Sequence, residues 1–226
     1  MNTILRNLGL AVVATLTIGN SGNWNTRIDA TDRVHTIGNP EAETTLTEFV
    51  SYTCPHCATF AIEGEAPLQL AYIGSGKVRL EMRSFVRNVV DLTATMLVQC
   101  GDTDKFLQNH TMFMMKQSEW LEKARRATPS QQAIWVGPDK QRARQNMAQT
   151  LGFYDMMATR GYERPQVDRC LADQDRADTL VANTRLDATE FGVRGTPSFV
   201  LNGDLLQGVH NWETLETALN AELATR

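Results

Sequence analysis

The pattern of apolar and polar residues predicts a β-α-β unit near the start of the chain. Residues Leu46–Tyr52 are mostly apolar, as expected for a strand that is covered on both faces of a sheet. Residues Lys77–Arg83 alternate between apolar and polar side chains, which is the period of a strand. The stretch between them, 54–72, predicts a helix that ends at Gly74–Gly76. A shorter stretch, Val34–Ile37, predicts an edge strand.

A long block of helical spacing, about residues 90–175, follows this unit. Pro129 and Pro138 interrupt the block, so we expect several short helices. Farther along, Asn202-Gly203 is a strong hairpin signal. The elements expected after the block are a helix over 177–191, strands over Ser198–Leu201 and Asp204–Gly208, and a final helix capped by Asn211. This order predicts an α/β sandwich of a βαβ half and a ββα half, with a helical insertion.

Composition narrows the function classes. The 226 residues are 42% hydrophobic, enough for one full core. The formal net charge is −4, and no long basic run is present. We therefore expect neither a nucleic acid nor an anionic membrane surface as a partner, and nothing in the sequence requires more than a monomer.

The first residues are typical of a targeting segment. A short region with one positive charge precedes the uncharged, mostly apolar stretch Leu8–Ile18, and Gly19 and Ser21 are small residues suited to a cleavage site. The apolar stretch is short for a membrane span. Residues 1–21 are therefore predicted to be a signal peptide for export to the periplasm, with an uncleaved anchor as the alternative.

The sequence Cys54-Pro55-His56-Cys57 stands between the first predicted core strand and its helix. A helix N-terminus has unpaired N–H groups and a partial positive charge, which stabilise a thiolate. The thiolate is the nucleophile of disulfide chemistry. The second sulfur is spaced to attack a mixed disulfide formed on the first. The motif therefore predicts a redox-active dithiol.

Two other interpretations of the motif are half of a zinc site and an inert packing pair. A zinc site needs a second close pair of Cys or His ligands. The remaining cysteines, Cys100 and Cys170, are 70 residues apart, and the four histidines have no His-x-x-x-His spacing. We therefore expect no metal site and no cofactor.

The combination of Glu48-Phe49-Val50, the Cys-Pro-His-Cys motif, a helical block and Gly195-Thr196-Pro197 resembles the DsbA family of exported thiol:disulfide oxidoreductases, in the thioredoxin superfamily. The resemblance covers about Val34 to Leu223. It implies a thioredoxin fold with a helical insertion domain. The expected parts are a signal peptide (1–21), an N-terminal arm (22–43), the first half of the fold (44–89), the helical insertion (90–175) and the second half (176–226).

The resemblance also assigns roles to the motif. Cys54 is expected to be the nucleophile, with an exposed sulfur, and Cys57 the more buried resolving thiol. His56 is expected to stabilise the Cys54 thiolate, the alternative being an idle loop histidine. Pro55 stiffens the first turn at little cost in hydrogen bonding. A stabilised thiolate favours the reduced pair, so the disulfide form is expected to be a strong oxidant.

Further roles come from residues outside the motif. Pro197 is expected to be a cis-proline beside the active pair, the alternative being an ordinary trans-proline. The backbone of Thr196 is expected to pair with a substrate peptide. Some oxidases of the family have an apolar residue before this proline, whereas reductases and isomerases often have threonine. Glu48 is expected to be a buried proton acceptor or, alternatively, a solvated glutamate. A second acid that some relatives carry on the active-site helix is replaced here by Ala61.

An even number of cysteines in an oxidising compartment suggests a second disulfide, and some relatives bridge this region. We therefore hypothesise a Cys100–Cys170 bond, the alternative being two buried free thiols. His110, on an apolar helical stripe, is most simply a core histidine.

The sequence thus predicts an exported enzyme that introduces disulfide bonds into exported proteins. The implied partners are reduced or unfolded exported proteins and a membrane quinone-linked oxidase of the DsbB type. An exported reductase or isomerase of the same fold is one alternative. A metal-binding module or a non-enzymatic chaperone is the alternative from another class.

Overall fold

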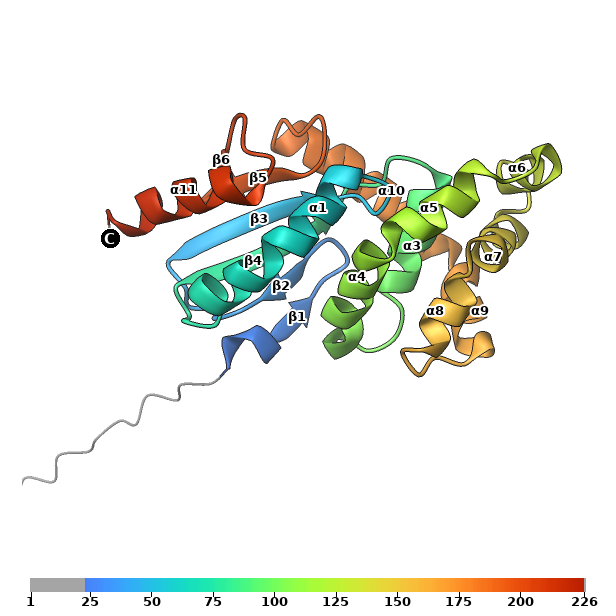
Figure 1. The fold of residues 1–226 in the computed structure, drawn as a ribbon, viewed down its shortest axis with the longest axis horizontal. Coiled ribbons are helices and arrows are strands. Elements are labelled where there is room, and N and C mark those ends of the chain that lie inside the picture. The colour runs from blue at the N-terminus through green and yellow to red at the C-terminus, as the bar shows by residue number, and fades with distance from the viewer. Residues whose placement is uncertain (1–22, 226) are drawn as a thin grey trace, which may run out of the picture.

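A computed structural model describes residues 23–225, and the predicted signal peptide lies outside these residues. Within them, six strands form one sheet in the order β1-β2-β4-β3-β5-β6 (Figure 1). The strands are β1 (Ile28–Ala30), β2 (His35–Ile37), β3 (Thr44–Val50), β4 (Val78–Ser84), β5 (Ser198–Leu201) and β6 (Asp204–Leu205). β3 runs parallel to β4, and the other neighbouring pairs are antiparallel. The predicted βαβ and ββα halves are both present.

The central strand β3 is buried because helices cover both faces of the sheet. Leu46 and Val50 join the core cluster that includes residues of helices α1 (Pro55–Glu63) and α11 (Trp212–Leu223). Phe49 packs instead with Phe191, which caps helix α10 (Gln174–Glu190) on the other side. The alternation of side chains along a strand therefore places Glu48 on the face that carries α1.

The predicted single helix over 54–72 is interrupted in the structure. It divides into α1, the short α2 (Glu65–Pro67) and the π-helical turn η2 (Leu68–Ile73). Gly64 ends α1, and a Cβ there would lie 2.8 Å from the Phe60 ring. Pro67 has no N–H to donate, which disturbs regular α-helical bonding at this point. Glu65, immediately after Gly64, is thereby placed in the core.

Helices fill the chain between β4 and β5, as predicted. In chain order they are α3 (Val89–Val98), the 3-10 turn η3 (Thr103–Lys105), α4 (Phe106–Met115), α5 (Gln117–Arg125), α6 (Pro129–Trp135), α7 (Lys140–Leu151), α8 (Phe153–Ala158), α9 (Arg164–Ala172) and α10. Figure 1 shows α4 to α9 gathered beside the sheet, while α10 returns to it. A disulfide joins Cys100, just after α3, to Cys170 in α9.

The edges of the sheet differ from the prediction. The N-terminal arm supplies a 3-10 turn η1 (Trp24–Thr26) and two strands rather than one. The strand β1 was not predicted, because its three residues, Ile-Asp-Ala, are too few to show an alternating pattern. At the other edge, β6 stops at Leu205, short of the predicted Gly208. The turn itself is as predicted, since Asn202 and Gly203 both have positive φ, 50° and 96°.

Helix α10 is fastened to the sheet and to the N-terminal arm by ion pairs from two arginines to one buried aspartate. Asp187 is buried and accepts hydrogen bonds from Arg33 and Arg83, which come from the N-terminal arm and β4. This anchor fixes the end of α10, from which the chain enters the loop before Pro197. None of the helices within residues 23–225 has both the length and the apolar character needed to cross a membrane.

Candidate active site

The active-site loop between β3 and α1 is held by buried hydrogen bonds. The Asp91 carboxylate accepts bonds from the Ser51 hydroxyl at 2.6 Å, the Tyr52 N–H at 2.8 Å and the Arg87 N–H at 2.9 Å. Burial raises the pKa of Asp91 to about 6, although these bonds favour its charged form. From the other side, the Gln117 amide donates to the carbonyl oxygens of Tyr52 and Cys54. The loop therefore presents Cys54 in a fixed position.

Cys54 is the N-cap of α1, and Pro55 occupies the first turn. The residue is only 3% exposed, so the sulfur is not open to solvent as the resemblance implied. The reason is the loop before Pro197, where the Thr196 carbonyl oxygen lies 3.0 Å from the Cys54 sulfur. A nucleophile covered in this way needs a substrate that reaches it through the adjoining cavities.

The pKa values of the two thiols of the motif are shifted in opposite directions. A hydrogen bond from Cys57 is the main cause that lowers the pKa of Cys54 to about 5. Burial opposes this shift, while the Thr196 side chain and two backbone N–H groups of the first helical turn add to it. For Cys57, which is 1% exposed, burial and then the interaction with Cys54 raise the pKa well above its ordinary value. Both cysteines carry free thiols in this structure.

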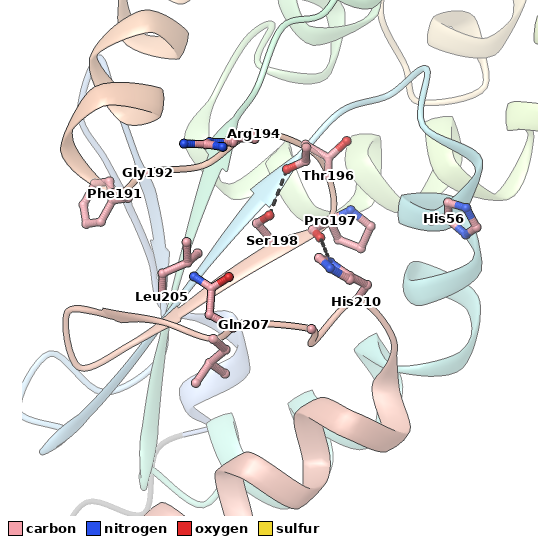
Figure 2. A pocket seen from close by; sticks show the side chains of 13 residues that line it. His56, Phe191, Gly192, Arg194, Thr196, Pro197, Ser198, Leu205, Gln207 and His210 are labelled. Atoms are coloured by element: carbon pink, nitrogen blue, oxygen red, sulfur yellow. Dashed lines mark hydrogen bonds between the residues drawn. The ribbon is translucent and has the colours of Figure 1, made fainter.

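The Thr196–Pro197 peptide bond is cis, and Pro197 is buried in the loop that covers Cys54. The turn is tied by a bond from the Ser198 hydroxyl to the Gly195 carbonyl and by His210 Nδ1 to the Pro197 carbonyl, both at 2.9 Å. A cavity of about 940 Å³ opens beside it. Figure 2 shows this cavity, with His56 on α1 at one side and Phe191 at the other.

A smaller cavity of about 450 Å³ reaches Cys54 itself. Its walls include Phe85, Arg87 and Arg194, and the exposed His56 forms part of its rim. Both arginine side chains belong to exposed residues. The approach to the sulfur is therefore lined by basic side chains, although the chain as a whole carries a negative net charge.

Beneath the motif lies a group of buried titratable residues. Glu48 is 1% exposed, which excludes the solvated alternative, and its Oε2 atom has no hydrogen-bond partner among residues 23–225. Burial and, to a smaller extent, the negative charge of Glu65 raise the pKa of Glu48 to about 8, while His110 opposes the shift. His110 is fully buried, as expected of a core histidine. Its Nε2 contacts Glu65 at 2.5 Å, and its Nδ1 contacts the Tyr52 hydroxyl at 2.9 Å.

Four residues of this site were missed by the sequence reasoning. They are Glu65, Asp91, Gln117 and Arg194. Glu65 follows Gly64, and its burial was missed because a single unbroken helix was predicted over 54–72. Asp91 is the third residue of a helix and looks like an ordinary N-terminal acid. No pattern within a surface helix marks Gln117, because its partners belong to a distant loop. In the described part of the chain, no cluster of His, Cys, Asp and Glu is arranged to hold a metal ion.

The geometry can be compared with known proteins. A family model described as thioredoxin matches residues 30–221. A candidate protein-disulfide oxidoreductase from Rickettsia conorii is 28% identical over 87% of this chain and 62% of its own length. A similar protein from Rickettsia typhi is 30% identical over 78% of this chain and 57% of its own length. The chain thus spans about three fifths of the length of these curated relatives.

Solved structures match over most of the described fold. The crystal structure of a protein-disulfide isomerase from Novosphingobium aromaticivorans has a TM-score of 0.83 and 38% identity, covering 86% of this chain and 99% of that one. The crystal structure of Wolbachia pipientis α-DsbA1 has a TM-score of 0.66 and 18% identity, covering 82% and 88%. At that identity the second match shows the likeness of the fold alone.

Proposed function

Since the chain belongs to the thioredoxin family and has a DsbA-like fold, we propose that it is a protein-disulfide oxidoreductase that donates its Cys54–Cys57 disulfide to other proteins. The observation that carries the proposal is the placement of the two thiols beside the cis-proline: Cys54 is the N-cap of α1, and Cys57 lies in its first turn. A pKa of about 5 keeps Cys54 as a thiolate at neutral pH. Stabilising that thiolate stabilises the reduced pair, and each pKa unit is worth about 1.4 kcal/mol. The disulfide form is accordingly the better oxidant.

The exchange proceeds in two displacements. A substrate thiolate attacks the Cys54 sulfur, the Cys54–Cys57 bond breaks, and the electron pair passes to Cys57. A second substrate thiolate then attacks the substrate sulfur in the mixed disulfide, and Cys54 leaves as its stabilised thiolate. The substrate loses two electrons and gains a disulfide, while the enzyme pair becomes reduced. Glu48 is the proposed partner for the proton that Cys57 gains in the first displacement and loses on re-oxidation.

The substrate is proposed to enter along the loop of the cis-proline. In this proposal the backbone of Thr196 pairs with an extended peptide, and the cavity beside Pro197 receives the neighbouring side chains of that peptide. The exposed His56 stands at the junction of the two cavities, where it can add positive charge beside the reacting sulfurs. Pro55 keeps the first turn of α1 stiff.

We further propose that the protein works outside the cytoplasm, in the periplasm, after export by residues 1–21. The Cys100–Cys170 disulfide supports this location, because such bonds persist in oxidising compartments. The substrates are then reduced or unfolded exported proteins, and a membrane quinone-linked oxidase of the DsbB type restores the disulfide. A monomer is sufficient for this chemistry.

Disulfide isomerisation is a second candidate function. The isomerase from Novosphingobium is the structure with 38% identity, and threonine precedes the cis-proline here. Two substrates separate the candidates: a reduced protein that needs disulfides, and the same protein with scrambled disulfides. With glutathione excluded, the oxidised enzyme should restore activity to the reduced substrate. Rescue of only the scrambled substrate, by the reduced enzyme, would favour the isomerase.

A further inference from the structure

A buried ion pair joins the thioredoxin half of the molecule to the helical block behind the active site. Glu65 belongs to α2, and His110 belongs to α4. Both side chains are removed from solvent, and both ring nitrogens of His110 are occupied, one by Glu65 and the other by the Tyr52 hydroxyl. Tyr52 lies two residues before Cys54 in the active-site loop. The pair is therefore connected to the active-site loop through Tyr52.

This position has a consequence for Glu48. The acid faces α1, where Cys57 lies, and its Oε2 atom makes no hydrogen bond within the described residues. Its proton affinity is consequently set by burial and by nearby charges rather than by local donors. The two charges that act on it come from Glu65 and His110, and they act in opposite directions.

We propose that Glu65 and His110 are positioning residues that control when Glu48 exchanges a proton with Cys57. This inference rests on the proposed disulfide exchange at the same site. On re-oxidation, the Cys57 S–H bond breaks, an O–H bond forms on Glu48, and the electron pair stays on sulfur. The Cys57 thiolate then attacks Cys54 in the mixed disulfide and releases the partner thiolate. A cationic His110 keeps Glu48 ionised often enough to accept that proton.

The groups around the network define its charge balance. Glu65 on α2 and His110 on α4 act on Glu48, and Glu48 in turn acts on Cys57 on α1. His110 is faced by Glu65, by the neutral Tyr52 hydroxyl and by His35 on β2. Burial lowers the pKa of His35 to about 4, so it is neutral at working pH.

The protonation of His110 follows from the same surroundings. Burial disfavours the imidazolium, but the charge and hydrogen bond of Glu65, with the charge of Glu48, outweigh it and raise the pKa of His110. Without Glu65, burial alone would leave the ring neutral. His110 is therefore a cation only because the Glu65 carboxylate lies beside it.

Two substitutions separate this role from simple packing. His110→Gln leaves the negative charge of Glu65 beside Glu48 with no cation, so the pKa of Glu48 should rise by about one unit. Glu65→Gln removes both charges, because His110 then becomes neutral, and the pKa of Glu48 should stay or fall. If the two substitutions only loosened the core, both would shift the pKa of Glu48 in the same direction.

The test follows the reduced full-length protein as it reacts with oxidised glutathione at pH 5 to 10. Acid quenching and mass spectrometry give the rate at which Cys57 resolves the Cys54–glutathione disulfide. In the native protein this rate should rise with a midpoint near pH 8, where Glu48 ionises. His110→Gln should move the midpoint upward and slow the step about tenfold at pH 7, whereas Glu65→Gln should not. Glu48→Gln is the control that should lack this midpoint.

Alkylation of Cys54 provides a control measurement, since the pKa of that thiol is lowered by Cys57, Thr196 and backbone N–H groups. Its midpoint, near pH 5, should be the same in all variants. Two results would overturn the inference while leaving the oxidoreductase proposal intact. One is that the pH midpoint of the Cys57 resolution step is the same in the native protein and in His110→Gln. The other is that this midpoint shifts upward in both His110→Gln and Glu65→Gln. A native protein that forms no disulfide with glutathione would overturn both.

A measurement on the unmodified protein covers the case in which a variant fails to fold. Nitrogen NMR of labelled histidine should show the His110 ring protonated at pH 7. A neutral His110 ring at pH 7 would contradict the proposed charge pair directly.

Discussion

The molecule contains two cysteine pairs whose surroundings differ in nearly every respect. Cys54 and Cys57 lie within one turn at the start of a helix, carry free thiols and have pKa values shifted in opposite directions. Cys100 and Cys170 are 70 residues apart and are joined by a disulfide between the end of α3 and α9. The first pair is placed for reaction and the second for holding the helical block together.

The surroundings explain the difference. The Cys54 thiol of the first pair has Cys57 and helix N–H groups as hydrogen-bond donors, so its anion is stabilised, and a cavity beside it lets a partner approach. The second pair has no such arrangement of donors at a helix start. Its neighbouring backbone is fixed instead, since Tyr162 donates to the Cys100 carbonyl at 2.6 Å. The comparison teaches that the environment of a cysteine, rather than its presence, decides whether it reacts.

The largest effect should come from removing the nucleophile. Cys54→Ser should lower the rate of peptide dithiol oxidation at least about a thousandfold, because serine cannot form the disulfide with Cys57 that accepts the two electrons of the peptide dithiol. The double variant Cys100→Ala/Cys170→Ala should keep most of the rate. Loss of thiols from a two-cysteine peptide measures both. Comparable losses of rate in the two variants would contradict the division of roles.

The next effect concerns stability, for which the Cys100–Cys170 pair should matter more than Cys54. Opening the Cys100–Cys170 bond removes a cross-link over a long loop, which should lower the free energy of unfolding by about 2–4 kcal/mol. Denaturant unfolding of the double alanine variant measures this loss. Cys54→Ser serves as its control: compared with the reduced native protein at pH 5, where the Cys54 thiolate contributes little, it should change stability far less. An unchanged midpoint in the double variant would show that the insertion does not depend on the bond.

The pH dependence of stability should distinguish reduced from oxidised protein. In the reduced state the folded pKa of Cys54 is depressed to about 5, so its contribution is present above the unfolded value of about 8.5 and is lost as pH falls toward 5. The thermal unfolding midpoint of the reduced form, relative to that of the oxidised form, should therefore rise from pH 5 to pH 8. A difference that stays constant over this range would mean that the thiolate is not stabilised by the fold.

The smallest effect should come from the residue before the cis-proline. Thr196→Val keeps the backbone carbonyl near Cys54 but removes the hydroxyl, which contributes to the lowered pKa of that thiol. The pKa should rise modestly, with a change of about two- to fivefold in the exchange equilibrium. The pH dependence of Cys54 alkylation gives the shift. A lowered pKa in this variant would contradict the assigned contribution.

Much of the fold was accessible from sequence because its signals are local. The apolar run before Cys54, the alternation over 77–83 and the Asn202-Gly203 turn each specify an element through neighbouring residues. The interrupted active-site helix was less accessible. Gly64 and Pro67 are visible in the sequence, but the break depends on how closely Phe60 packs against the following turn. The short strand β1 forms because β2 is beside it, not because of its own pattern.

The residues of the site likewise fall into those that local sequence motifs reveal and those that they do not. Cys54, Cys57 and Pro197 come from motifs that a reader can find along the chain. The charge network does not, because Glu48, Glu65 and His110 are contributed by a strand and two helices that only the fold brings together. The prediction of an exposed Cys54 sulfur was wrong, because a loop 142 residues away in sequence covers it.

The equilibrium of the Cys54–Cys57 pair with glutathione tests the central claim most directly. The protein is incubated with defined ratios of reduced and oxidised glutathione, and the fraction of reduced pair is measured by thiol trapping. Our account predicts that reduced glutathione readily reduces the pair, because the Cys54 thiolate is stabilised. A pair that stays oxidised even in a large excess of reduced glutathione would contradict the claim that this enzyme donates disulfides.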